Sequence, residues 1–351
     1  MSHPDVPGRG TAANPPNRYE PLHVELEPDP DSDAPPAPTV FYRDASRTIL
    51  AENDSPDIGF RFSLNPYRGC EHGCAYCYAR PTHEYLGFSA GLDFERRIMV
   101  KEDAPALLRQ TLASRRWEPQ VVALSGNTDC YQPVERRLEI TRRCLEVFAE
   151  FRNPVSAITK SALVARDADL FAELARHGAA HVLFSVTTLD PELARRMEPR
   201  AARPERRLEA MAALAQAGVP VGVLIGPVIP GLNDAEIPRI LEAAARAGAQ
   251  SASWVLLRLP KPVDELFERW LEERYPERRA RVLARIRETR GGRLSDSTFG
   301  RRQRGEGEYA EQIAALFTAV AKKHGLDRRL PPLSIEAFRR PARGDEQLTL
   351  L

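Results

Sequence analysis

Three cysteines lie within eight residues of one another, at Cys70, Cys74 and Cys77. Thiolates bind zinc or the irons of an iron–sulfur cluster. Clusters that only carry electrons normally take four cysteines. Because this loop offers three, it suits a four-iron cluster whose last iron has no protein ligand. The spacing therefore predicts a cluster with one iron open to a small molecule.

A structural zinc site is the alternative interpretation of the same loop. Closed zinc sites are tetrahedral and usually combine two ligand pairs that are far apart in the sequence. The chain has five cysteines and no second Cys-x-x-Cys pair. His72 and His83 are near enough in the sequence to supply a fourth ligand, so zinc stays open at this point.

The residues around the cysteines carry a family resemblance. Three residues separate Cys70 from Cys74, two separate Cys74 from Cys77, and Tyr76 stands just before the third cysteine. This pattern resembles the radical S-adenosylmethionine superfamily. The run from Asn65 to Arg80 is similar to the branch that includes spore photoproduct lyase. The resemblance spans about residues 60–260 and implies a [4Fe–4S] cluster, bound S-adenosylmethionine and a partial (β/α)6 TIM-like barrel.

Length, charge and cysteine content bound the remaining possibilities. A chain of 351 residues is long enough for one large α/β domain with appendages or for two small domains. The net charge of +1 gives no overall preference for nucleic acid or a membrane. Few cysteines favour a reducing compartment. No apolar run approaches the roughly 18 residues that span a bilayer, and the N-terminus lacks a secretory signal. We expect a cytoplasmic protein without a membrane partner.

Composition divides the chain into four parts. Residues 1–38 are rich in proline and acidic residues, so they are predicted to be a disordered tail. Residues 39–260 are predicted to form the barrel with its N-terminal lead-in. Residues 261–328 are predicted to be a helical, arginine-rich extension, and residues 329–351 a C-terminal tail.

Short apolar runs alternate with longer helical patterns between the cysteines and residue 260. Runs that are apolar on both faces predict parallel strands joined by helices. Counting a strand before the cysteines gives about six repeats, fewer than the eight of a closed barrel. The site of such a fold lies at the C-terminal ends of the strands. The predicted strands are 120–125, 154–159, 181–186, 219–225 and 251–257, and the predicted helices are 141–151, 167–177, 204–217 and 234–247.

Polar residues at these strand ends are the candidates for holding S-adenosylmethionine. The resemblance implies that Ser125 and Asn127 offer oxygen acceptors to its amino group, although the superfamily often has a Gly-Gly-Glu-like sequence there. Lys160 follows the next strand and suits the carboxylate as a point charge. Ser185 and Thr187 point the same way along an extended segment and suit the ribose or the carboxylate.

Further candidates come from the later strands and from the cysteine loop. Gly226 lies in a glycine-rich strand exit that lets the backbone approach an adenine ring. Tyr76 either flanks the cluster or adenine, or packs in the core. The cations around Arg200 and Arg206 either reach the same ligand or lie on a solvated surface.

Cys130 follows the second strand, where a barrel rim is expected. Spore photoproduct lyase has a hydrogen-donating cysteine in this neighbourhood, without a residue-for-residue match. The resemblance makes Cys130 a candidate hydrogen-atom donor or radical relay, with Tyr131 beside it. A small buried apolar residue is the alternative for Cys130. Cys144 lies on the apolar face of a predicted helix and is expected in the core.

The resemblance also implies the chemistry. S-adenosylmethionine would chelate the open iron through its amino and carboxylate groups. One electron, from a reductant such as a flavodoxin or ferredoxin, would then cleave its carbon–sulfur bond. The product is a 5′-deoxyadenosyl radical, which abstracts hydrogen from a substrate.

Arginine is dense between residues 272 and 304. Such a segment either tracks the phosphate backbone of DNA or RNA, or forms a solvated helix face. Three alternatives stay open: a radical enzyme acting on nucleic acid, a radical enzyme acting on a peptide or small metabolite, and a non-catalytic zinc or electron-transfer protein. The aromatic residues that could stack on bases or simply pack are Trp254, Trp270, Tyr275 and Phe299.

Overall fold

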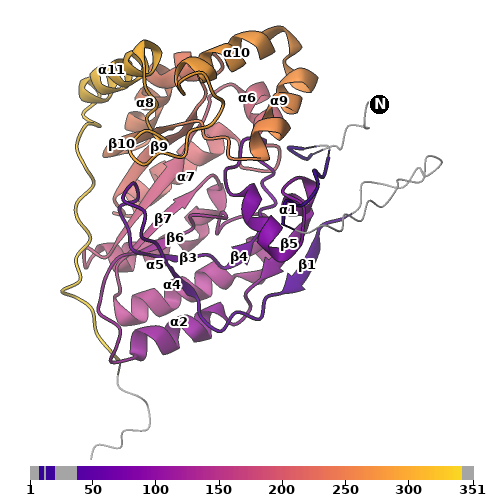
Figure 1. Ribbon diagram of the computed structural model, residues 1–351. Helices are drawn as coiled ribbons and strands as arrows, with labels where there is room; N and C mark the ends of the chain where they lie inside the picture. Colours follow the sequence, from indigo (N-terminus) through magenta and orange to yellow (C-terminus); the bar gives the residue numbers. More distant parts are fainter. Residues whose placement is uncertain (1–7, 12, 20–37, 342–351) are drawn as a thin grey trace, which may run out of the picture.

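A curved, open sheet forms the centre of the molecule (Figure 1). The computed structural model describes residues 8–11, 13–19 and 38–341. Within these residues, six strands run parallel and the antiparallel strand β2 lies at one edge. The two edge strands, β10 and β2, do not pair with each other, so the sheet is not closed, which confirms the predicted partial (β/α)6 barrel. The strands in spatial order are β10 (Ser251–Leu256), β9 (Val221–Val228), β8 (Ala180–Ser185), β7 (Val155–Thr159), β6 (Val122–Leu124), β3 (Phe62–Leu64) and β2 (Leu50–Glu52).

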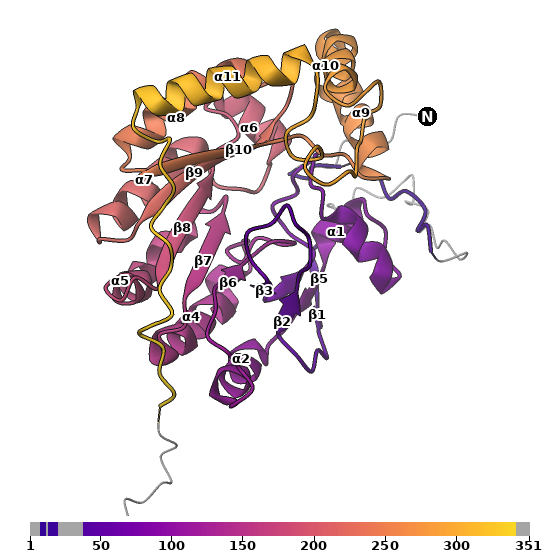
Figure 2. The ribbon, with the colours of Figure 1, turned by 60° about the vertical axis from the view of Figure 1, so that its left-hand side comes forward.

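The central strands are largely buried because helices cover their outer face and side chains fill the barrel. All three residues of β6 are buried, as expected for a parallel strand covered on both sides. Cys144 of α4 is fully buried in the main core, which confirms its predicted place. Figure 2 shows the helices on the outside of the sheet. They are α2 (Ala104–Ala113), α4 (Ile140–Phe151), α5 (Ala168–Ala175), α7 (Pro204–Gln216) and α8 (Ile237–Arg246).

A second, three-stranded sheet carries the cysteine loop. Its order is β1 (Val40–Arg43), β5 (Arg97–Val100) and β4 (Tyr67–Arg68), and β4 leads directly into Cys70. Two short helices, η1 (Arg80–Leu86) and α1 (Leu92–Arg96), follow the loop and return the chain to β5. The loop is therefore held between this small sheet and the strand ends of the barrel.

Short helices occupy several of the connections between strands. The connection after β6 contains α3 and that after β7 contains η2, whereas α6 follows β8 and η3 follows β9. Their bounds are α3 (Glu135–Leu138), η2 (Ala162–Asp167), α6 (Pro191–Met197) and η3 (Asp234–Glu236).

Three helices follow the last strand, in the region predicted to be a helical extension. Helix α11 (Glu308–Lys323) packs on α8, and α9 (Val263–Arg274) packs on α10 (Pro276–Glu288). Beyond them the chain runs extended along the outside of the barrel (Figure 1), where the backbone N–H of Ser334 donates to the carbonyl of Gly178 at 2.9 Å. Among the described residues, no helix is both long enough and apolar enough to cross a membrane.

Part of the segment assigned to a disordered tail has a defined place. Residues 8–11 and 13–19 pack against the cysteine loop, η1 and α1 through hydrogen bonds to Glu84, Asp93 and Glu95. Composition alone does not reveal such contacts, because the partners lie more than 60 residues away in the chain. The rest of the predicted tail lies outside the described residues.

Candidate active site

The three cysteines lie in one loop and share apolar neighbours. Cys70 and Cys74 are 7% and 8% exposed, Cys77 is half-buried, and all three are free thiols. Cys77 packs against both the apolar group that contains Cys70 and the one that contains Cys74. Gly73, with φ of 65°, lets the chain turn between the first two cysteines.

The connection after β6 holds this loop against the barrel. The side chain of Gln132 accepts a hydrogen bond from the backbone N–H of Glu71 at 2.9 Å and donates one to the carbonyl of Gly69 at 3.2 Å. The Glu71 carboxylate accepts from the backbone N–H of Val134 at 2.8 Å. The backbone of Asp129 partly offsets the rise in the pKa of the Cys70 thiol. These contacts fix the cysteine loop at the end of β6.

The donor set fits an iron–sulfur cluster. Burial raises the pKa of the Cys70 thiol well above its usual value, and the neighbouring Asp129, Cys74 and Cys77 raise it further. Burial likewise raises the pKa of Cys74 to about 12. A bound cationic centre removes the cost of ionising buried thiols.

The two histidines considered as zinc ligands have other partners. The ring Nε2 of His83 is 2.8 Å from the carbonyl of Arg97, and the ring lies edge-on to Phe94. The Nδ1 of His72 is 3.4 Å from the carboxylate of Asp129. Among the described residues, no three His, Cys, Asp or Glu side chains are grouped so that they could hold a metal ion.

A buried polar network lies beside the cysteine loop, with Glu198 at its centre. The Glu198 carboxylate accepts hydrogen bonds from the hydroxyls of Tyr76 and Thr187, the latter at 2.7 Å, and pairs with the guanidinium of Arg207. The ammonium of Lys160 is 5.7 Å from the centre of the Tyr76 ring. Burial opposes ionisation of Glu198, but Arg207 and Lys160 outweigh it and lower its pKa to about 2. Glu198 is therefore an anion at neutral pH.

Hydroxyls at the end of β8 join this network to β9. Ser185 donates to the carbonyl of Gly226 at 3.0 Å, and Thr187 lies 3.4 Å from the same oxygen. Arg207 adds a hydrogen bond to the carbonyl of Ser185 at 2.9 Å. Asn233 bonds the carbonyls of Thr187 and Pro227 instead of capping the helix that follows.

The structure brings most of the predicted cofactor residues together and shows what the sequence missed. Sequence patterns could not single out Glu198, because its role depends on burial beside Arg207 nine residues later. The neighbouring Arg206 is exposed and pairs with Glu209. The predicted cofactor residues that surround the network are Tyr76, Lys160, Ser185, Thr187 and Gly226.

Ser125 and Asn127 lie in a neighbouring turn after β6. Ser125 has φ of 92°, a left-handed conformation that costs a non-glycine residue about 1 kcal/mol or more and is often found at functional sites. Its hydroxyl accepts from the backbone N–H of Cys130 at 3.0 Å. The side chain of Asn127 is exposed. Asp129 connects this turn to the network, because it accepts from the backbone N–H of Lys160 at 2.7 Å.

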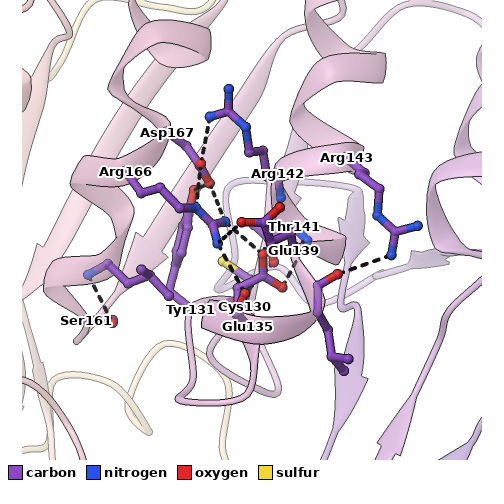
Figure 3. A network of polar contacts seen from close by, with 12 residues as sticks. Cys130, Tyr131, Glu135, Glu139, Thr141, Arg142, Arg143, Ser161, Arg166 and Asp167 are labelled. Atoms are coloured by element: carbon purple, nitrogen blue, oxygen red, sulfur yellow. Dashed lines mark hydrogen bonds and ion pairs between the residues drawn. The ribbon is translucent and has the colours of Figure 1, made fainter.

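Cys130 and Tyr131 are fully buried rather than placed at an open rim (Figure 3). The chain turns inward after Ser125, so the thiol of Cys130 lies in the core against the Ser125 hydroxyl, and burial raises its pKa. Tyr131 donates to Asp167 at 3.1 Å, within a group of ion pairs that includes Arg166 and Glu135. The hydrogen-donor hypothesis for Cys130 stays a prediction.

Many arginines of residues 272–304 have ion-pair or hydrogen-bond partners within the protein. Arg279 pairs with Glu268 at 2.5 Å, Arg302 pairs with Asp57 at 2.5 Å, and Arg290 is buried against the carbonyl of Leu257 at 2.6 Å. Of the nearby aromatic residues, Phe299 is exposed, whereas the buried ones are Trp254, Trp270 and Tyr275. The arginines of this segment therefore serve as partners of other residues in the protein more than as a surface that binds a phosphate backbone.

A family model described as the radical SAM superfamily matches residues 64–244. The chain belongs to the radical SAM superfamily. It is therefore a radical SAM enzyme, as the cysteine loop predicted. The match begins at the end of β3 and reaches into α8, so it contains the cysteine loop, the Glu198 network and most of the barrel strands.

The chain is also similar to uncharacterised relatives and to solved structures. An uncharacterised protein of Mycobacterium tuberculosis is 38% identical over 233 residues, which are 66% of this chain and 67% of the relative. One from Methanocaldococcus jannaschii is 28% identical over 219 residues, covering 62% and 78%. The structure of spore photoproduct lyase complexed with dinucleoside spore photoproduct aligns with a TM-score of 0.57 at 17% identity, over 82% of this chain and 79% of that one. This last likeness shows a shared fold.

Proposed function

We propose that this radical SAM enzyme binds a [4Fe–4S] cluster through Cys70, Cys74 and Cys77 and reductively cleaves S-adenosylmethionine. The observation that carries the proposal is the placement of three free thiols, two buried and one half-buried, in one loop beside an ionised carboxylate network. When bound, the cluster supplies the electron that breaks the carbon–sulfur bond and so generates the 5′-deoxyadenosyl radical.

The chain's own residues bind and orient the methionyl end of the cosubstrate. Lys160 offers a point charge to its carboxylate, and the ring of Tyr76 below the ammonium fixes where that charge lies. The carboxylate of Glu198 accepts a hydrogen bond from Tyr76 and so holds its ring in place. Because Glu198 remains ionised, it stabilises the positive charges of Arg207 and Lys160 in this buried site. Ser125 and Asn127 are the proposed acceptors for the amino group.

We propose a nucleic-acid substrate for the radical. Tyr78 directly follows the third cysteine and is 47% exposed, and the guanidinium of Arg258 lies 5.3 Å from the centre of its ring. An exposed aromatic ring with a cation beside it suits a stacked base next to a phosphate. The shared fold with spore photoproduct lyase, solved with a dinucleoside photoproduct, supports the same substrate class. We further propose a flavodoxin or ferredoxin as the reductant.

The test of the cofactor proposal is 5′-deoxyadenosine release. The protein is reconstituted with iron and sulfide without oxygen, reduced with dithionite, and given S-adenosylmethionine. We expect 5′-deoxyadenosine from the native chain and from Cys144→Ala, whose cysteine lies in the core, and none from Cys74→Ala. Protein that holds one tetrahedral metal ion and no acid-labile sulfide would instead support the zinc alternative.

The substrate proposal has its own test. Binding to a single-stranded oligonucleotide is measured over a range of salt concentrations, since phosphate contacts make affinity fall as salt rises. Substrate labelled with deuterium then shows whether the label enters 5′-deoxyadenosine. Binding with a clear salt slope and label transfer support a nucleic acid. No affinity at low salt would favour a peptide or small metabolite.

A further inference from the structure

The N-terminal segment touches the backbone of the cysteine loop. A Cβ atom added to Gly10 would lie 1.5 Å from the carbonyl oxygen of Gly73, between the first two cysteines. The backbone conformation of Gly10 is not left-handed, so only this close approach requires glycine. Both residues are buried. Gly10 therefore packs directly on the proposed cluster-binding loop.

One buried carboxylate joins the two segments. Glu95 of α1 is 0% exposed and accepts hydrogen bonds from the backbone N–H of Gly10 at 3.1 Å and the hydroxyl of Thr11 at 3.3 Å. The same carboxylate pairs with Arg80 at 2.5 Å. Arg80 is fully buried and donates from its Nε and a terminal nitrogen to the carbonyl of Cys74, at 3.2 and 2.9 Å. Hydrogen bonds and one ion pair thus connect the N-terminal segment, through Glu95 and Arg80, to the backbone of Cys74.

The rest of the segment is held at specific points along η1 and α1. Asn14 and Asp93 exchange hydrogen bonds, the Asn14 side chain donating at 3.1 Å and the Asp93 backbone at 3.0 Å. The hydroxyl of Ser89 donates to the carbonyl of Pro15 at 2.7 Å. At the far end, Arg18 pairs with the buried Glu84 at 2.6 Å. Such repeated pairing distinguishes a docked segment from a loose tail.

We propose that residues 9–11 and 13–18 form a brace that holds the cysteine loop in its ligand-binding conformation and covers its outer face. Glu95 is the positioning residue, because it ties the brace to Arg80 and so to the Cys74 backbone. Loss of the Glu95 charge leaves Arg80 buried without its counter-ion, which favours local opening. The proposal rests on the cluster-binding function proposed above.

Two pairs of variants in the full chain test the brace. Gly10→Ala introduces the clash with Gly73, and its control Gly59→Ala adds a methyl group where no atom lies within 4 Å. Glu95→Gln weakens the junction at the cysteine loop. Its control Glu84→Gln weakens the contact to Arg18 at the other end of the same segment. Should Glu95→Gln fail to fold, Gly10→Ala carries the test alone, since residue 10 lies outside the helices and strands.

Three measurements are made on each variant. Trypsin cleavage of the metal-free protein after Arg9 and after Arg18 reports opening at the two ends of the brace. In reconstituted protein, the decay of the cluster absorbance in air reports access to the cluster, and the midpoint potential reports its surroundings. We expect Gly10→Ala and Glu95→Gln to speed cleavage after Arg9 and cluster decay by about tenfold, because cleavage follows the open population. We also expect a shifted midpoint potential.

The outcomes separate the brace from the function it rests on. Cleavage after Arg9 at the native rate in both Gly10→Ala and Glu95→Gln would overturn the brace. Faster cleavage with unchanged cluster decay and potential would overturn its positioning role. If the native chain takes up no cluster, the proposed function fails, whereas faster cleavage in the metal-free variants still supports the docked segment. Glu84→Gln is expected to speed cleavage after Arg18 alone.

Discussion

Replacing Glu198 by glutamine removes the charge at the centre of the buried network while nearly preserving its shape. Glu198 accepts hydrogen bonds from Tyr76 and Thr187 and is the counter-ion of Arg207. Both charged side chains are almost fully buried. In the variant, Arg207 stays buried without a counter-ion, and the glutamine NH₂ faces groups that are themselves donors. We therefore expect a large loss of stability.

The size of the loss follows from the pKa of Glu198. Burial raises that pKa, but Arg207 and Lys160 outweigh it and lower the value from 4.5 to about 2. At about 1.4 kcal/mol per pKa unit, this shift corresponds to roughly 3 kcal/mol. Removing one partner of a buried ion pair costs about 3–5 kcal/mol in other proteins, which is consistent. We expect Glu198→Gln to lower the free energy of unfolding by about 3 kcal/mol at neutral pH.

The effect has a defined pH dependence. Because the pKa of Glu198 is lower in the folded state, its contribution is complete above the unfolded value of 4.5 and is lost as the pH falls toward 2. Urea unfolding of the metal-free native chain and of Glu198→Gln, from neutral pH down to the acid range, measures this difference. Glu209→Gln, on the helix that carries Arg207, is the control, since its exposed pair with Arg206 is worth less than about 1 kcal/mol. A loss below about 1 kcal/mol, or one independent of pH, would refute the reasoning.

Further variants test the other assigned roles. Lys160→Met should weaken S-adenosylmethionine binding by about tenfold to a hundredfold in an equilibrium binding assay, as expected for a lost charge-assisted contact, while the exposed Lys261→Met should leave it unchanged. Cys130→Ala should lower the free energy of unfolding by about 1–2 kcal/mol, because it leaves a cavity in the core. An unchanged product distribution in Cys130→Ala would eliminate its role as hydrogen donor. Arg258→Gln should reduce the affinity for an oligonucleotide and the dependence of that affinity on salt. Arg279→Gln should change neither, because Arg279 is already paired with Glu268. Equal effects of the two substitutions would contradict a binding site at Tyr78 and Arg258.

Local sequence patterns were sufficient for the barrel and for the cysteine loop. The predicted strand over residues 154–159 corresponds to β7, and the predicted helix over 204–217 to α7. These patterns work because central strands such as β6 and β9 are largely buried, which leaves apolar runs, and because each helix buries one face, which leaves a periodic pattern. The place of Lys160 and Ser185 at strand ends could be predicted for the same reason, since both directly follow or end a predicted strand.

The parts that sequence patterns missed depend on contacts between distant residues. Gly10 meets Glu95 across 85 positions, so the acidic, proline-rich composition of residues 1–38 as a whole does not reveal that Gly10 is docked. Arg206 and Arg207 are neighbours of the same type, yet one is exposed and the other is buried with Glu198. Arginine density in the C-terminal region likewise concealed internal pairs such as that of Arg302 with Asp57. Charge alone does not specify a partner.

The most direct test of an iron without a protein ligand is a spectrum recorded with and without the cosubstrate. The anaerobically reconstituted protein is reduced and examined by electron paramagnetic resonance before and after S-adenosylmethionine is added. We predict a [4Fe–4S] signal whose g values change on addition, because Cys70, Cys74 and Cys77 leave one iron open. A cluster signal that S-adenosylmethionine leaves unchanged would contradict this central claim.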